Sequence, residues 1–466
     1  MSDNAIASLI PRGSIGLKLL LVCLLVLAMA IPLAMVGFIM AGRQDRAHEV
    51  IAEIGARAGG QQTLGGPVLL VPYVRNSPTT SQAGTQQTNV IHGAYLVLPK
   101  TGAADAVLAV ADRRRGIYRA AIYAADTEFH ADFDPASALA NIDPGDHLDW
   151  SGARVVMFAR DARAMRAGPT LRFDENAPID AVPAMDLSIL PASGSTQDAR
   201  FAPQDDAAMQ AFMAPAPGGG PHRFSVQAHM AVSGAQRFAI AAFAQNTTVS
   251  MRGNRRDVSA SGYYQSVDPL APDAHGFAAT WRAPLAANGE RAIDMAQFGL
   301  SGLSSRDMAV SFVSSNDLYV GVARAVSYAI LFIGLIFLAT LIFEAVSGKK
   351  AHPAQYILVG LAQCVFYLLL LSMTEIVGFD RAFLLGAGAT IVLLSYYAWT
   401  SARSLAVGAG ALIGLIALYG AMYVLLTLED YALLAGSAVA FLAIAAAMIA
   451  TRRIDWYGGP PQPAAS

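Results

Sequence analysis

Apolar residues gather in long runs near the two ends of the chain, with a more polar stretch at residues 41–322 between them. The first run covers residues 19–40. Five more runs follow residue 320, at residues 325–346, 354–377, 381–399, 405–428 and 431–450. Because about 20 apolar residues in a helix span the hydrocarbon core of a bilayer, each run predicts a transmembrane helix. The sequence thus predicts six spans in a multi-pass membrane protein.

The first run is expected to be an uncleaved anchor helix, bent at Pro32. Ala28-Met29-Ala30 resembles a signal-peptidase site, but the run stays apolar for ten residues beyond it, where a cleaved signal would turn polar. Cys23 lacks the small preceding residue of a lipoprotein cysteine, so we interpret it as a packing residue. After the run, apolar residues at helical spacing up to Gly59-Gly60 predict a short separate helix next to the membrane.

The distribution of basic residues predicts the orientation of these spans. Six spans place both termini on one side of the membrane, and the segments on that side carry Arg12, Lys18, Lys349, Lys350, Arg403, Arg452 and Arg453. Because basic residues are enriched in cytoplasmic segments, residues 1–18 and the disordered tail 451–466 are expected in the cytoplasm. Residues 41–322 are then exported, which means periplasmic if the protein lies in the inner membrane of a Gram-negative bacterium.

The exported stretch has the two-residue alternation of apolar and polar side chains that is typical of β-strands. Segments such as VLLVPYV, AYLVLP, HRFSVQAHMAVSG and QRFAIAAFA alternate in this way, with clusters of Gly, Pro, Asn and Asp between them. We expect mostly antiparallel β-structure in one large domain or two smaller ones. The predicted fold class is an α+β membrane protein with one N-terminal transmembrane helix, a β-rich exported domain and a C-terminal five-helix transmembrane bundle.

Composition agrees with a membrane protein and narrows the function. Of the 466 residues, 55% are hydrophobic and 14% are charged, against about 25% charged in an ordinary soluble domain. The net charge is −2 and the basic residues are dispersed, so no nucleic-acid partner is expected. Both cysteines, Cys23 and Cys364, lie in apolar runs, which excludes a disulfide framework and a cysteine nucleophile from the exported region.

Two groups of polar residues in the exported region could hold a divalent cation. The first alternates along one predicted strand and consists of His130, Asp132 and Asp134; the second lies in a turn and consists of Asp143, Asp146, His147 and Asp149. The residues between members of the first group are apolar, which favours a half-buried strand with a polar face toward water. The second group lacks EF-hand spacing and contains Asp-Pro-Gly, an ordinary turn. We therefore expect no metal, no cofactor and no catalytic residue.

The segment between the second and third spans raises a separate question, because it places a carboxylate close to hydrocarbon. Glu344 lies about one helical turn from the end of the second span, and Pro353 starts the third. A carboxylate there is costly unless it is paired or reaches water. We expect Glu344 to be an interfacial, paired residue with a cation from the same side, and Lys349, His352 and Arg403 are the candidates. A proton relay and a catalytic role are the alternatives.

The same segment carries the motifs of a known family. The order of Tyr328, Phe343-Glu344, His352-Pro353, Gln355-Tyr356, Gly360, Phe366-Tyr367, Glu375 and Gly378-Phe379 resembles the pattern of the CreD family of bacterial inner-membrane proteins. A second matching block contains Gln62, Gly66-Pro67 and Pro72-Tyr73, and weaker blocks lie at residues 113–126 and 276–281. The candidate family-motif or packing residues are therefore Gln62, Gly66, Pro67, Pro72, Tyr73, Glu344, His352, Pro353, Gln355, Tyr356 and Glu375.

The resemblance implies a cellular role but no specific reaction. CreD proteins are often labelled cell-envelope integrity proteins, and the resemblance implies a role in envelope stress and the β-lactam response, in some members under a CreBC two-component system. One segment departs from the family pattern: GNRRDVSASGYY, residues 253–264, stands where the family commonly has Trp-Pro-His-Pro-Ser-Phe. A role assigned to that family segment cannot be transferred to this chain.

Three functions are compatible with these patterns. The favoured one is a non-enzymatic envelope protein whose exported β-domain senses, binds or scaffolds an envelope or peptidoglycan-associated partner, in an oligomeric state that the sequence leaves open. A transporter or channel is the first alternative, although the mid-span polar residues Gln363, Ser395 and Tyr419 are neutral. Gly410 and Gly414 are expected to let two helices approach closely. A periplasmic metal-dependent hydrolase is the second alternative.

Overall fold

The computed structural model describes residues 15–80, 86–140, 142–184, 209–267, 271–273, 276–285, 291–294, 303–312, 317–347, 351–428 and 432–452. The chain divides into two compact units. The membrane unit comprises Met1–His48 and Ser315–Ser466, and the β unit comprises Glu49–Ser314. Residues 453–466 of the tail predicted at residues 451–466 lie outside the described residues, and Thr451 is the last residue of a helix.

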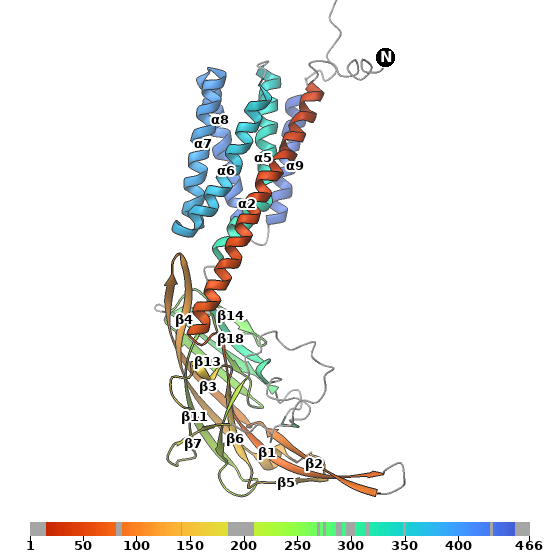
Figure 1. Ribbon diagram of the computed structural model, residues 1–466, viewed down its shortest axis with the longest axis vertical. Helices are drawn as coiled ribbons and strands as arrows, with labels where there is room; N and C mark the ends of the chain where they lie inside the picture. The colour runs from red at the N-terminus through yellow and green to blue at the C-terminus, as the bar shows by residue number, and fades with distance from the viewer. Residues whose placement is uncertain are drawn as a thin grey trace, which may run out of the picture. The chain divides into compact units, whose positions relative to one another are not determined.

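The described residues form six long helices that belong wholly or partly to the membrane unit (Figure 1). They are α2 (Ile15–Arg57), α5 (Asp317–Ser347), α6 (Pro353–Val377), α7 (Phe379–Ala402), α8 (Leu405–Thr427) and α9 (Ala432–Thr451). Helices α2 and α5 to α8 are long and apolar enough to cross a membrane, and α9 adds a 20-residue apolar helix. This arrangement and the β unit confirm the α+β membrane fold class.

Helix α2 differs from the expectation of two separate helices, because it runs unbroken for 43 residues (Figure 1). The residues that follow the apolar run, AGRQDRAHEVIAEIGAR, are mostly good helix formers and contain no proline. The helix therefore continues past the apolar run and past Pro32 until Arg57. It ends as predicted before the glycine pair, since Gly59 and Gly60 have φ angles of 102° and 65°.

The described residues of the β unit form two sheets. The ten-stranded sheet has the order β14 (Val258–Gly262), β18 (Asp307–Phe312), β12 (Arg237–Ala241), β1 (Gln62–Thr80), β6 (Arg154–Ala159), β10 (Gln210–Pro215) and β9 (Val182–Pro183). Three further strands complete it: β2 (Gln86–Val97) and β5 (Asp146–Leu148) pair with β1, and β17 (Ala292–Asp294) pairs with β2.

The eight-stranded sheet has the order β15 (Ala271–Asp273), β16 (Gly276–Ala283), β13 (Thr247–Gly253), β3 (Thr101–Arg115), β4 (Tyr118–Phe133), β11 (Phe224–Ala235), β7 (Thr170–Phe173) and β8 (Ile179–Asp180). Most neighbouring strands are antiparallel, as predicted. The pairs β1 with β12 and β3 with β13 are parallel. A short helix, α3 (Pro135–Ala138), follows β4, and a 3₁₀ turn, η1 (Ala162–Ala164), follows β6.

One hydrophobic core joins the two sheets. Aromatic pairs contact across it: the ring centroids of Tyr123 and Phe238 are 5.6 Å apart, and those of Phe277 and Phe312 are 6.4 Å apart. In each pair the first residue belongs to the eight-stranded sheet and the second to the ten-stranded sheet. The same buried cluster continues through both sheets, so Glu49–Ser314 forms one β unit rather than two.

Candidate functional site

Glu344 forms the first of two charged contacts between α2 and the other membrane helices. Lys18 of α2 donates a hydrogen bond from Nζ to Oε1 of Glu344 in an ion pair. The hydroxyl of Tyr356 in α6 donates to Oε2 of the same carboxylate at 3.2 Å. Glu344 is only 7% exposed, so these two donors replace most of its contact with solvent. We call Lys18, Glu344 and Tyr356 the Lys18 clamp.

Glu375 forms a second contact of the same kind. Arg43 of α2 donates from Nη1 to Oε2 of Glu375 at 2.5 Å, and the hydroxyl of Tyr319 in α5 donates to Oε1 at 2.9 Å. The side chain of Glu375 is 9% exposed, and Tyr319 is buried. We call Arg43, Glu375 and Tyr319 the Arg43 clamp.

The two clamps are reciprocal. Each combines a cation from α2, a carboxylate from α5 or α6, and a tyrosine from the other helix of that pair. Lys18 and Arg43 are 25 residues apart in α2, and Tyr319 and Glu344 are also 25 residues apart in α5. That spacing corresponds to about 37 Å of helix, slightly more than the roughly 30 Å of hydrocarbon. The clamps therefore stand at the two ends of one membrane crossing.

Between the clamps, a glycine brings three helices together. A Cβ at Gly360 of α6 would stand 2.6 Å from Sδ of Met29 in α2 and 2.8 Å from the ring of Phe337 in α5. Only a residue without a side chain fits there. Among the five candidate spans, α2 has the least buried apolar segment. In lipid, the burial of apolar side chains does not by itself keep one helix associated with others. The clamps and Gly360 thus supply the specific contacts of α2.

His352, Pro353 and Gln355 form the start of α6. Nδ1 of His352 accepts a hydrogen bond from the backbone N–H of Ala354, and the side-chain carbonyl of Gln355 accepts one from the N–H of His352. This reciprocal pattern is a capping box, with Pro353 in the first helical turn, where a missing N–H costs little. Nε2 of Gln355 also donates to Ser401 in α7 at 2.7 Å. These candidate residues therefore define where α6 begins and how it contacts α7.

A groove with a volume of about 790 Å³ opens between α5, α6, α7 and α8. Its lining is mainly apolar, with Glu344, Gln355 and Ser401 among its polar members. Gly410 and Gly414 line it as well, and no described atom lies within 4 Å of the position that a Cβ would take at either glycine. The expectation that these two glycines bring helices together is wrong, because their side of α8 faces the groove.

The neutral mid-span residues are buried between α6, α7 and α8. The hydroxyl of Tyr419 donates to Oε1 of Gln363 at 2.9 Å. Nε2 of Gln363, the hydroxyl of Tyr367 and Oγ of Ser395 are buried and have no hydrogen-bond partner among the described residues. Buried polar atoms of this kind are ordinarily satisfied by ordered water.

In the β unit, the candidate residues of β1 have separate structural tasks. The buried amide of Gln62 donates to the carbonyl of Gly59 and accepts from the N–H of Asp161, which ties the end of α2 to the loop after β6. Gly66 and Pro67 lie where the register between β1 and β6 shifts. A Cβ at Gly66 would stand 2.5 Å from the ring of Phe243, so a glycine is needed there.

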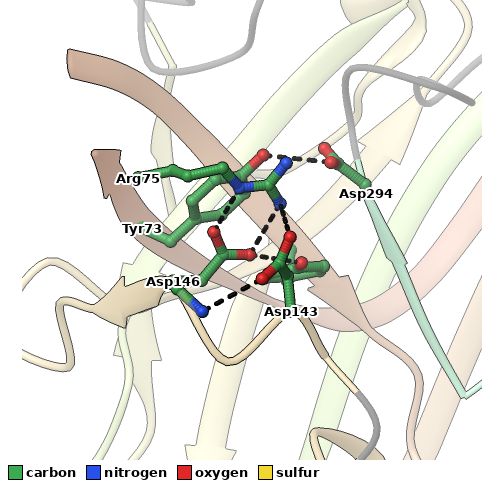
Figure 2. A network of polar contacts seen from close by, with 7 residues as sticks. Tyr73, Arg75, Asp143, Asp146 and Asp294 are labelled. Carbon is green, nitrogen blue, oxygen red and sulfur yellow. Dashed lines mark hydrogen bonds and ion pairs between the residues drawn. The ribbon is translucent and has the colours of Figure 1, made fainter. Parts of the chain in front are cut away.

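Tyr73 belongs to a polar network that joins four strands (Figure 2). Arg75 of β1 donates from Nε and Nη2 to the two carboxylate oxygens of Asp146 in β5, at 2.5 and 2.8 Å. Tyr95 of β2 donates to the same carboxylate at 2.6 Å, and Tyr73 donates to Asp294 of β17 at 3.0 Å. Figure 2 also shows Asp143 beside this guanidinium, with an oxygen 3.8 Å from Nη2.

The electrostatics of this network fix its charge state at neutral pH. The hydrogen bonds from Arg75 hold the pKa of Asp146 below its ordinary value. Burial, together with the hydrogen bond to Asp294, raises the pKa of Tyr73 to about 12. Asp146 is therefore a carboxylate and Tyr73 a neutral phenol, which suits a fixed contact. Next to this network, the carbonyl of Pro72 accepts from the N–H of Asp149 at 2.8 Å.

The residues considered as possible cation ligands have separate surroundings in the structure. His130 and Asp132 are exposed on β4 while Phe129, Ala131 and Phe133 are buried, which confirms the half-buried strand. Asp134, just beyond that strand, pairs with Arg223. In the second group, Asp146 of β5 pairs with Arg75, whereas Asp149 accepts from Ser151. No cluster of three His, Cys, Asp or Glu side chains suited to a metal is present in the described part of the chain.

Comparison with known proteins shows the family. The family model described as "Inner membrane protein CreD" matches residues 14–457. The chain belongs to the CreD family. Inner membrane protein CreD of Escherichia coli (strain K12) is 28% identical over 438 residues, which cover 93% of this chain and 91% of that relative. Together with the apolar helices, this similarity makes the present CreD protein a multi-pass inner-membrane protein.

Sequence reasoning missed the partners of the candidate residues in this CreD protein. Glu344 is paired, as expected, but its cation is Lys18 rather than His352 or Arg403, and Lys349 lies outside the described residues. Glu375, a packing candidate within the third predicted span, lies within α6 and pairs with Arg43. The partners are 326 and 332 residues apart in sequence, so no local pattern relates them. The shared signal is a cation at each end of the first apolar run.

Proposed function

We propose that this CreD protein is a non-enzymatic envelope protein in which an exported β unit senses, binds or scaffolds an envelope partner and the membrane unit anchors it. The observation that carries the proposal is α2, one continuous helix with a charged clamp at each end of its membrane crossing. Its last turns pack on the β unit, where Ile51 and Ile54 contact Ala120. Such a helix suits mechanical support.

The contacts of the buried carboxylates support a structural role for these residues. Glu344, Glu375 and Asp146 each bind one basic side chain and one tyrosine hydroxyl. At each position the opposite charge and the second donor offset part of the cost of removing the carboxylate from water. This arrangement favours fixed contacts over proton transfer at all three positions.

The orientation is part of the proposal: both termini are cytoplasmic and residues 41–322 are periplasmic. It rests on the basic residues near the termini and between the second and third spans. Reporter fusions at Ala83 and Ala216 should behave as exported, whereas fusions at Ser347 and Ser466 should behave as cytoplasmic. A cytoplasmic signal at Ala83 would overturn the orientation.

The proposed partner is an envelope or peptidoglycan-associated protein, in the envelope-stress and β-lactam context that the family resemblance implies. The test is recovery of the tagged full chain from envelopes cross-linked before solubilisation. An envelope protein enriched in that sample, and absent when cross-linker is added only after solubilisation, is the expected result. Recovery of the chain with no enriched protein would contradict the scaffolding role.

Transport is the second candidate function, because the groove between α5 and α8 has the size of ligand pockets, roughly 300–1,000 Å³. Buried polar atoms of Gln363 and Ser395 add unpaired hydrogen-bonding capacity within the same helices. Native mass spectrometry of the protein released from its own membrane separates the two functions. A stoichiometric small solute that is lost in a Gly410→Leu variant, which fills the groove, would favour transport.

A further inference from the structure

The groove between α5, α6, α7 and α8 reaches from one end of the membrane crossing to its middle. Its polar lining residues Glu344, Gln355 and Ser401 lie near the end of α5, the start of α6 and the end of α7. The lining continues to Leu335 in α5 and Leu418 in α8. Leu335 and Glu344 are nine residues apart, or about 14 Å of helix, which is close to half of the roughly 30 Å hydrocarbon core. The groove therefore has the depth of one leaflet.

Small residues keep the inner part of this groove open. Gly410 and Gly414 of α8 line it, and no described atom lies within 4 Å of the position that a Cβ would take at either glycine. Ala398 of α7 and Val359 of α6 add short apolar side chains to the lining. Because these helices are long and apolar enough to cross a membrane, acyl chains are the apolar molecules that can fill the space.

The surface end of the groove suits a polar head group. Nε2 of Gln355 donates to Oγ of Ser401 at 2.7 Å, so the hydroxyl of Ser401 accepts one hydrogen bond and can donate another. The carboxylate of Glu344 is paired with Lys18, which balances its charge within the protein. The described lining residues at this end thus offer hydrogen bonds and no unpaired carboxylate.

A cation follows this polar end directly in the chain. Arg403 comes two residues after Ser401, is exposed, and forms no ion pair with any described residue. The side chain of Ser404 makes no capping bond to the first turn of α8, and Ala406 of that turn lines the groove. The N–H groups at the start of a helix are donors that a phosphate can accept from. A guanidinium and a helix N-terminus therefore accompany the polar end of the groove.

We propose that this groove binds one acyl chain of an anionic phospholipid, whose phosphate contacts Arg403 and the first turn of α8. The chain lies along Gly410 and Gly414, and the second chain of the lipid stays in the surrounding bilayer. A guanidinium binds a phosphate through two parallel hydrogen bonds, and an anionic lipid lacks the ammonium group that would offset this attraction. The proposal concerns the membrane unit alone, so it stands or falls independently of any partner of the β unit.

The test is native mass spectrometry of the full chain released from its own membrane, with the activation energy raised until loosely associated lipids are lost. We expect a stoichiometric phospholipid to remain bound, with phosphatidylglycerol enriched over phosphatidylethanolamine relative to the membrane. The mass of a phospholipid also distinguishes this result from the small solute expected of a transporter. No retained phospholipid, or a small solute in its place, would overturn the proposal.

Filling the groove should expel the chain. Gly410→Leu should lower the fraction of protein that retains the lipid at least about tenfold, and Gly414→Leu is a second filling variant in case the first fails to fold. The matched control is Gly420→Leu, since Gly420 belongs to the same helix, has open space where its Cβ would stand, and does not line the groove. That variant should keep the lipid. Equal loss in the filling variants and the control would overturn the proposed site.

The contact with the head group is tested at Arg403. Arg403→Asn removes the charge, and asparagine tolerates the left-handed backbone at this position, where φ is 48°. The enrichment of phosphatidylglycerol should fall about fivefold, which is the contribution of one basic residue near anionic lipid. Arg381→Asn makes the same change of charge at the start of α7, the opposite end of that helix, and should leave the enrichment unchanged. Equal effects of the two substitutions would overturn the proposed contact between the phosphate and Arg403.

Discussion

Glu344 shows at the residue scale how a charge is kept beside hydrocarbon. The carboxylate is 7% exposed, which would be costly for an isolated charge. Lys18 supplies an opposite charge and Tyr356 supplies a second donor, so both oxygens are occupied. The side chain of Lys18 is itself 37% exposed, which lets its ammonium keep part of its hydration.

The first prediction separates the shape of Glu344 from its charge. Glu344→Gln keeps one acceptor oxygen for Lys18, and its NH2 group can donate to the hydroxyl of Tyr356, so it should retain most of the abundance and thermal stability in detergent. Glu344→Leu leaves Lys18 without its acceptor and should cost about 1–3 kcal/mol in unfolding free energy. Thermal unfolding of the purified full chain measures both. If Glu344→Gln abolished an envelope phenotype at unchanged stability, a proton relay would replace the structural role.

The second prediction concerns Asp146 and pH. Its pKa is lower in the folded chain than in the unfolded chain, so its stabilising contribution is complete above the unfolded pKa, near 4, and is lost as the pH falls through the folded value. Asp146→Asn should therefore lower the unfolding free energy by about 2 kcal/mol at pH 7. The difference between the two proteins should shrink toward zero below about pH 4. A pH-independent difference in thermal unfolding would contradict this assignment.

At the element scale, β1 carries a bulge that depends on a glycine. A Cβ at Gly66 would overlap the ring of Phe243, which belongs to the core between the sheets. Gly66→Ala should therefore lower the unfolding free energy by about 1–3 kcal/mol, since an extra methyl group in a packed core forces neighbours to move.

The control for that variant is Gly168→Ala, because Gly168 has open space where its Cβ would stand. It should leave stability within about 0.5 kcal/mol of the parent. Equal effects of the two substitutions, measured by thermal unfolding, would show that the contact with Phe243 does not limit the choice of residue at position 66.

Helices and strands with a regular pattern of apolar residues could be predicted from the sequence, whereas the side-chain contacts between these elements could not. The apolar runs predicted the spans, and the alternation around Phe129, Ala131 and Phe133 predicted a half-buried strand. The break expected in α2 was wrong because good helix formers carry the helix past the membrane. Pairing of Arg75 with Asp146, 71 residues apart, depends on the order of strands in the sheet, which no local pattern encodes.

At the scale of the whole molecule, α2 belongs to both units and its contacts with each are specific. Its N-terminal part carries Lys18 and Arg43, and its last turns carry Ile51 and Ile54. Lipid tails surround an apolar helix as favourably as neighbouring helices do. The clamps are therefore expected to decide whether α2 stays associated with α5 and α6. The proposed anchoring of the β unit depends on that association.

The most direct test of the account is therefore a charge exchange at the Arg43 clamp, which avoids the basic residues that set orientation. Arg43→Glu and Glu375→Arg should each lower the thermal stability of the full chain in nanodiscs. The double variant should recover much of it, with a coupling energy of about 1–3 kcal/mol. Arg46→Glu combined with Glu375→Arg is the matched control and should give no recovery. Additive losses in the Arg43→Glu/Glu375→Arg variant would contradict the claim that this ion pair holds α2 to the bundle.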